Sequence, residues 1–200
     1  MRVAEIYDTI QGEGLNAGIP MTFVRLQGCS VGCPWCDTKP TWDSAAGVDM
    51  GPEEIVSKCS LPWVCLTGGE PAEQDCGRLT ALLYTVSKKL AVETSGEGNG
   101  LGGPITHLTL SPKVAVFPDC RDRVNPSLLK RADELKFVIG KPADLDAAVR
   151  FVAGGGMTNP TLLLQPVSQN ERAARLCVDF ILANPTWRLS TQTHKYLGLR

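Results

Sequence analysis

The chain has 200 residues, of which 43% are hydrophobic and 20% charged, a composition typical of a globular protein and not of a disordered one. Its 20 lysines and arginines balance 21 aspartates and glutamates, and no block of like charge occurs. This balance argues against direct binding to nucleic acid or to an anionic membrane. A chain of this length buries one sizeable core, so we expect a single domain over residues 1–200.

Strand and helix signals alternate along the chain. In chain order, the sequence predicts a strand at 21–26, a helix at 51–59, a strand at 63–67, a helix at 74–89, a strand at 90–94, a glycine-rich loop at 96–103, a strand at 105–110, a helix at 126–132, a strand at 134–139, a helix at 143–153, a strand at 161–164, a helix at 170–183 and a strand at 187–191. This alternation predicts a parallel sheet with right-handed crossovers. About six such strands, or seven, fall short of the eight in a closed barrel. We therefore expect an α/β fold, a partial TIM-like barrel.

The N-terminal residues lack the apolar run of a signal peptide, and no apolar stretch reaches the roughly 18 residues of a membrane span. A cytoplasmic location is therefore expected. In a reducing compartment, eight cysteines indicate metal binding or catalysis before disulfides. Five lie scattered in apolar surroundings and are expected to be small buried side chains: Cys59, Cys65, Cys76, Cys120 and Cys177.

The other three cysteines, Cys29, Cys33 and Cys36, form a C-x3-C-x2-C motif after the first predicted strand. Thiolates select zinc, copper(I) or iron–sulfur clusters. A structural zinc site or an ordinary ferredoxin cluster takes four protein ligands. Three cysteines therefore predict a four-iron cluster with one iron open to a small molecule. The alternative is a zinc site whose fourth ligand comes from elsewhere in the chain.

Polar or glycine residues follow nearly every predicted strand. In parallel α/β proteins the active site lies at the carboxyl ends of the strands. One such cluster alone would be ordinary turn chemistry. Six of them predict one polar mouth, shared with the cysteine loop: 27–29, 67–71, 93–96, 111–113, 165–166 and 192–194.

The cysteine motif, with Trp35 before its last cysteine and Thr67-Gly68-Gly69-Glu70-Pro71 further on, resembles the radical S-adenosylmethionine superfamily. Seven segments narrow the resemblance to the 7-carboxy-7-deazaguanine synthases: 10–14, 25–29, 36–38, 92–96, 111–113, 164–166 and 192–195. The match runs from residue 10 to about residue 197. It implies the partial barrel of radical S-adenosylmethionine enzymes.

The resemblance implies a [4Fe-4S] cluster whose open iron binds S-adenosylmethionine and, once reduced, cleaves it to a 5′-deoxyadenosyl radical. That radical takes hydrogen from 6-carboxy-5,6,7,8-tetrahydropterin, which contracts with loss of ammonia to 7-carboxy-7-deazaguanine. The product feeds deazaguanine biosynthesis, such as queuosine in tRNA, so a link to nucleic acid needs no basic face. An electron donor such as flavodoxin or ferredoxin and a homodimer are implied in the same way.

Residue roles also follow from the resemblance. The cluster ligands are Cys29, Cys33 and Cys36, and Thr38 is placed at a magnesium ion. The residues implied for S-adenosylmethionine are Trp35, Cys36, Asp37, Gly69, Glu70, Ser111, Pro112, Lys113, Gln165 and Pro166. Those implied for the pterin are Ile10, Gln11, Gly12, Glu13, Arg25, Thr67, His194 and Arg200.

Physical chemistry supports some of these roles more than others. A carboxylate such as Glu13 accepts adjacent N–H groups of a pterin edge, and the fork of Arg25 suits a substrate carboxylate. Arg25 also follows an apolar strand segment, where a guanidinium needs a partner. Plainer interpretations stay open for four residues: a core aromatic for Trp35, a helix-start acid for Glu70, a surface lysine for Lys113 and a structural histidine for His194.

Two other functions stay open from the sequence. The first is a glycyl-radical-enzyme activase of the same superfamily, which predicts a different set of substrate-side residues. The second is a non-enzymatic zinc or iron–sulfur module, which metal content distinguishes.

Overall fold

The computed structural model describes residues 1–117 and 119–199. Within them, nine strands form one sheet in the order β3-β1-β2-β4-β5-β6-β7-β8-β9. The strands are β1 (Arg2–Ile10), β2 (Pro20–Leu26), β3 (Val48–Asp49), β4 (Trp63–Thr67), β5 (Lys89–Thr94), β6 (His107–Leu110), β7 (Glu134–Ile139), β8 (Thr161–Pro166) and β9 (Trp187–Leu189). Because β3 and β9 are the two edges of the sheet, the barrel stays open, as the strand count predicts.

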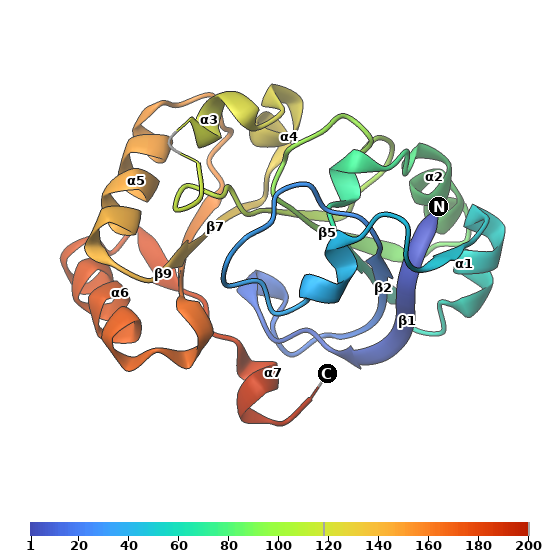
Figure 1. The fold of residues 1–200 in the computed structure, drawn as a ribbon, viewed down its shortest axis with the longest axis horizontal. Coiled ribbons are helices and arrows are strands. Elements are labelled where there is room, and N and C mark those ends of the chain that lie inside the picture. The colour runs from blue at the N-terminus through green and yellow to red at the C-terminus, as the bar shows by residue number, and fades with distance from the viewer. Residues whose placement is uncertain (118, 200) are drawn as a thin grey trace.

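Helices α1 to α6 form an arc along the outer side of the sheet, α7 lies apart from it near the C-terminus, and the loop after β2 crosses the inside of the arc (Figure 1). The α-helices are α1 (Pro52–Lys58), α2 (Gly77–Thr85), α3 (Cys120–Arg123), α4 (Pro126–Arg131), α5 (Pro142–Ala153), α6 (Glu171–Ala183) and α7 (Thr193–Tyr196). The short 3₁₀ helices are η1 (Gly14–Asn16), η2 (Lys39–Trp42), η3 (Pro71–Glu73) and η4 (Val167–Gln169). No helix in the described part of the chain is long and apolar enough to cross a membrane.

Seven strands run parallel, β2 and β4 to β9, which confirms the predicted α/β partial barrel. The sequence analysis did not predict β1, which pairs antiparallel with β2 and carries the short β3 on its other side. Val3 is the one fully buried residue of β1, and most other side chains of this strand are half-buried. A strand without a buried face lacks the apolar alternation that identifies strands.

One predicted helix is shorter than expected. Of residues 74–89, only Gly77–Thr85 are helical. At the start, the Gln74 side chain donates to the backbone carbonyls of Arg2 and Gln27, which holds this residue outside the helix. At the end, Ser87 has a φ of 58°, which terminates the helix.

The apolar core lies between the outer helices and the sheet. On β7, Leu135, Phe137 and Ile139 belong to this core, together with residues of the helices. The alternate residues, Lys136 and Val138, face the interior of the barrel. This period-2 alternation gives an apolar outer layer and a polar interior. The five scattered cysteines, Cys59, Cys65, Cys76, Cys120 and Cys177, are all buried, as predicted.

The segment after β1 lies across the interior of the barrel. Ile10 pairs with Pro20, the first residue of β2, so β1 ends at the amino-terminal edge of the parallel strands. The next residues reach distant strands: Gln11 Nε2 donates to Glu93 Oε1 on β5 at 2.9 Å, and the Leu15 backbone N–H donates to Glu134 Oε2 on β7 at 2.8 Å. We call residues 11–16 the floor segment.

Candidate active site

A cavity of about 240 Å³ lies inside the barrel, between the cysteine loop and the floor segment. Every polar cluster predicted at the carboxyl ends of the strands contributes to its wall. The predicted site residues that line it are Ile10, Gln11, Gly12, Glu13, Arg25, Cys29, Cys33, Trp35, Cys36, Asp37, Thr38, Thr67, Gly69, Glu70, Ser111, Lys113, Gln165, Pro166 and His194. Pro112 lies between two lining residues, and Arg200 is outside the described residues.

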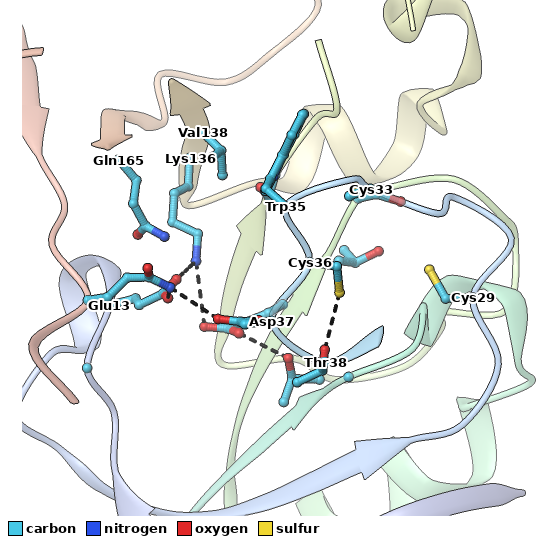
Figure 2. A pocket seen from close by; sticks show the side chains of 18 of the residues that line it. Glu13, Cys29, Cys33, Trp35, Cys36, Asp37, Thr38, Lys136, Val138 and Gln165 are labelled. Carbon is cyan, nitrogen blue, oxygen red and sulfur yellow. Dashed lines mark hydrogen bonds and ion pairs between the residues drawn. The ribbon is translucent and has the colours of Figure 1, made fainter. Parts of the chain in front are cut away.

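The three motif cysteines line the same side of the cavity. The loop that carries them is held by Gln27, whose Nε2 donates to the carbonyls of Pro40 at 2.8 Å and Asp43 at 2.7 Å. Burial raises the pKa of the Cys29 thiol to about 11 and also raises the pKa of Cys33. Cys36 Sγ faces Thr38 Oγ1 at 3.5 Å (Figure 2).

The three thiols lie in one loop at the cavity wall, and their number and chemistry are what a cluster with one open iron takes. In residues 1–117 and 119–199, no three His, Cys, Asp or Glu side chains stand close enough to bind one metal ion together. A four-iron cluster offers each thiolate its own iron, so the donor set of this loop suits a [4Fe-4S] cluster.

Two glycines let the end of β4 approach the cysteine loop. Gly69 has a φ of +53°, and a Cβ added there would clash with the backbone carbonyl oxygen of Gly28. Gly68 has a φ of +62°, and a Cβ there would clash with the side chain of Arg25. Next to them, the Glu70 backbone N–H donates to the Gly28 carbonyl at 2.8 Å. Only glycine combines this backbone conformation with so close a contact.

Glu70 is a buried carboxylate with several donors. It accepts from the backbone N–H of Ala72 at 2.9 Å, from that of Ser95 at 2.7 Å, and from the hydroxyls of Ser95 and Thr94. Burial raises the pKa of Glu70 in spite of these donors, which favour its charged form. Its bond to Ala72 caps η3, so Glu70 is a helix-start acid that also faces the cavity.

Arg25 finds its partners on the strand that the sequence did not predict. Its Nε donates to Glu5 Oε1 at 2.9 Å and its Nη2 donates to the Tyr7 hydroxyl at 2.6 Å, both on β1. The expectation that a guanidinium beside the core needs a partner is confirmed. These contacts fix the guanidinium in the cavity wall.

A further group of polar contacts involves Lys136, which the sequence analysis did not assign to the site, and Glu93, which it placed in the polar cluster 93–96 without a role. Lys136 Nζ forms an ion pair with Glu13 (Figure 2) and lies 4.0 Å from Glu93 Oε1. The only signal for Lys136 was a charge between two apolar residues of a predicted strand, Leu135 and Phe137. Burial alone would raise the pKa of Glu13, but Lys136 and the donated hydrogen bonds lower it to about 2.

The C-terminal segment closes the cavity between the floor segment and the cysteine loop. Gln192 Nε2 donates to Glu13 Oε1 at 2.7 Å, and Lys195 Nζ pairs with Asp37 Oδ2 at 3.2 Å. The Thr193 backbone N–H donates to the Gly12 carbonyl at 2.9 Å. A Cβ on Gly12 would clash with His194, so this glycine lets the two segments touch.

A partial α/β barrel with a three-cysteine loop, a glycine-lined strand end and one shared cavity defines a radical S-adenosylmethionine enzyme. Comparison with known proteins narrows the class. Residues 10–98 match a family described as "4Fe-4S single cluster domain". The chain is 36% identical to the 7-carboxy-7-deazaguanine synthase of Escherichia coli (strain K12) over an alignment of 221 positions, which covers 98% of both chains.

Two more comparisons agree. The 7-carboxy-7-deazaguanine synthase of Synechocystis sp. (strain ATCC 27184 / PCC 6803 / Kazusa) is 36% identical over an alignment of 204 positions, which covers 99% of this chain and 93% of the relative. The crystal structure of QueE from Escherichia coli matches with a TM-score of 0.82 and 34% identity, covering 96% of this chain and 94% of that one. The chain belongs to the 7-carboxy-7-deazaguanine synthase family.

Proposed function

We propose that this protein converts 6-carboxy-5,6,7,8-tetrahydropterin to 7-carboxy-7-deazaguanine with loss of ammonia, a step of queuosine and deazaguanine biosynthesis. Membership of the family supports the reaction. The observation that carries it for this chain is one cavity that joins the three-cysteine loop to the partly buried carboxylates Glu13 and Glu93 at the floor segment. Such a cavity holds a cofactor and a small polar substrate side by side.

Cys29, Cys33 and Cys36 would hold the [4Fe-4S] cluster. When bound, the cluster and S-adenosylmethionine supply a 5′-deoxyadenosyl radical, and the protein binds, orients and shields. Gly69 lines the cavity, and its close packing against Gly28 holds this strand end beside the cysteine loop, where the methionine part of the cofactor would bind. Further lining residues proposed for S-adenosylmethionine are Trp35, Asp37, Glu70, Ser111, Lys113, Gln165 and Pro166, with Pro112 between two of them.

On the opposite side of the cavity, the floor segment and the strand interiors form the pterin pocket. Glu13 is kept ionised, so both its oxygens are acceptors for the N–H groups of a pterin edge. Arg25 offers a charged donor to the substrate carboxylate from a position fixed by Glu5 and Tyr7. Ile10, Gln11, Gly12, Thr67 and His194 complete the lining proposed for the pterin.

The finer assignments rest on the family resemblance. Thr38 lines the cavity, where a magnesium ion would also be coordinated by substrate oxygens and water. The C-terminal Arg200 would contact the substrate. A flavodoxin or ferredoxin would supply electrons to a cytoplasmic homodimer.

Anaerobic reconstitution tests the proposal. Reconstituted protein should contain about four irons per chain. With a reductant, S-adenosylmethionine and 6-carboxy-5,6,7,8-tetrahydropterin, mass spectrometry should detect 7-carboxy-7-deazaguanine. Release of 5′-deoxyadenosine without that product would instead support the activase hypothesis. One zinc per chain and no iron would contradict both enzyme functions.

A further inference from the structure

Lys136 is a buried lysine that the proposed reaction leaves without a role. It lies on β7, on the inward face, and only 5% of its surface is exposed. A lysine is rarely buried unless it is paired. Its ammonium lies between two carboxylates from different parts of the chain, Glu13 in the floor segment and Glu93 on β5.

The hydrogen bonds around this group direct the carboxylates into the cavity. Glu93 accepts from Gln11 Nε2 at 2.9 Å and from Thr67 Oγ1 at 3.0 Å. Glu13 accepts from Lys136 and, at 2.7 Å, from Gln192 Nε2. Each carboxylate is therefore held in one orientation while both line the cavity.

Other titratable groups lie near this pair, and most of them are paired with other residues. The strands contribute Arg25, Cys65, His107 and Glu134. Arg25 is paired with Glu5, and Glu134 lies 3.5 Å from His107. The loops contribute His194, Asp37 and Lys195, of which the last two pair at 3.2 Å. Within the described part of the chain, Lys136 is thus the cation that pairs with both Glu13 and Glu93.

We propose that Lys136 is a positioning residue for the pterin: its ammonium holds the Glu13 and Glu93 carboxylates at a spacing in which both accept N–H groups of the substrate. The inference rests on the proposed function. Without the ammonium, Glu13 loses the charged partner that offsets the effect of burial on its pKa, and a protonated Glu13 carboxyl offers a donor where the substrate needs an acceptor. Lys136 therefore determines the range of pH over which the pocket binds pterin.

The test uses unreduced holoenzyme with S-adenosylmethionine, which binds substrate without turnover. Calorimetry under anaerobic conditions gives the Kd of 6-carboxy-5,6,7,8-tetrahydropterin between about pH 6 and about pH 8, where ordinary carboxyls do not titrate. The wild-type Kd should stay nearly constant. For Lys136→Met, binding should be at least about tenfold weaker at the lower pH than at the higher, because the Glu13 carboxyl, without its charged partner, takes up a proton. Any protonation of the substrate itself affects wild type and Lys136→Met equally, so it does not change the comparison between them.

Two variants separate charge from packing. Lys136→Arg keeps the positive charge and should restore a flat pH profile, even if the larger group weakens binding at every pH. Lys58→Met removes a half-exposed lysine of α1 whose partner Glu54 is 3.9 Å away, and it should behave as wild type. If Lys136→Met does not fold, Lys136→Gln keeps a donor without the charge and takes its place.

A substrate-free measurement separates this inference from the proposed function. Infrared difference spectra of Lys136→Met between the same pH values should show the C=O stretch of a protonated carboxyl, and Glu13→Gln in the same background should remove it. A flat binding profile in Lys136→Met, or no such band, would overturn the role of Lys136. Wild-type protein that fails to bind the pterin, with the band present in Lys136→Met, would refute the substrate and leave the ionisation role standing.

Discussion

Buried charges in the barrel interior are neutralised by partners from other strands, and these pairs determine how the site responds to pH. His107 and Glu134 are one such pair, on β6 and β7, with His107 Nε2 3.5 Å from Glu134 Oε2. That distance is long for a hydrogen bond, so the contact acts as an ion pair when the imidazole is protonated. Burial opposes the charge on His107, but Glu134 outweighs it and raises the pKa of the histidine.

The raised pKa of His107 predicts how stability varies with pH. A raised folded-state pKa contributes stability that is fully present below the ordinary value of about 6.5 and is lost as the pH rises through the folded-state pKa. Glu134 has a lowered pKa, because donors and His107 outweigh burial, so its contribution is lost only in acid. Urea unfolding of wild type should show a loss of stability above about pH 6.5 that is absent in His107→Gln. The same slope in both proteins would contradict this assignment.

Gly69 gives a second prediction about a single residue. In Gly69→Ala the new Cβ would meet the Gly28 carbonyl oxygen in a left-handed backbone conformation. We expect a loss of about 2–4 kcal/mol of stability, from strain plus displacement of the cysteine loop, and a lower iron content after reconstitution. The matched control is Gly155→Ala, which has a φ of +72° but no atom within 4 Å of its Cβ. This control should lose only the strain energy, about 1 kcal/mol, and equal losses would refute the clash.

At the scale of elements, one buried carboxylate, Glu134, anchors the Leu15 end of the floor segment. Glu134, which is 1% exposed, accepts from the Leu15 backbone N–H at 2.8 Å and from Thr109 Oγ1 at 2.7 Å. Gly14, in the same segment, donates its backbone N–H to Ser190 Oγ at 3.0 Å. Residues 11–16 thus lie across the barrel because side chains of distant strands accept their backbone donors.

Removing this carboxylate should release the floor segment without disturbing the cysteine loop. In Glu134→Ala, we expect weaker binding of the pterin by tenfold or more, roughly the loss of one charge-assisted hydrogen-bond network. The affinity for S-adenosylmethionine should change little, because Glu134 contacts the floor segment and β6. Parallel titrations of the pterin and of S-adenosylmethionine into wild type and variant measure how much each Kd changes. An equal loss for both ligands would mean that the variant damages the whole fold.

For the whole molecule, one sheet joins the two larger of three apolar clusters. The core around β2, β4 and β5 includes Val24, Leu66 and Val92, whereas the core around β7 and β8 includes Phe137 and Leu164. The two halves meet where β6 pairs with β7, through Thr109–Glu134 and Leu110–Leu135. Since the cavity spans both halves, its geometry depends on their folding together.

Removing a large core side chain therefore tests cooperativity. Phe137 packs against Phe151 and Trp187 with ring centroids 5.6 Å and 5.9 Å apart, so Phe137→Ala should cost about 3–5 kcal/mol. Its neighbour Val138 faces the cavity, and Val138→Ala should cost clearly less. Unfolding followed by circular dichroism and by tryptophan fluorescence should coincide for both variants. Two separate transitions would show that the halves fold independently.

The sequence by itself determined the features that depend on near neighbours along the chain. Cys29, Cys33 and Cys36 lie within eight residues of one another in the chain. The hydrophobic periodicity that identifies strands and helices is local as well. Because parallel strands bring their carboxyl ends to one edge, the polar clusters that follow them could be assigned to a single cavity. The partial barrel and the family followed from the same patterns.

Only the tertiary structure decided which charges meet. Lys136 and Glu13 are 123 positions apart, and Gln11 and Glu93 are 82 apart, so no local pattern links them. The half-buried β1 gave no periodic signal, yet it supplies the partners of Arg25 and places the floor segment. Local sequence determines periodicity, whereas the pairing of buried charges depends on the strand order and register of the folded sheet.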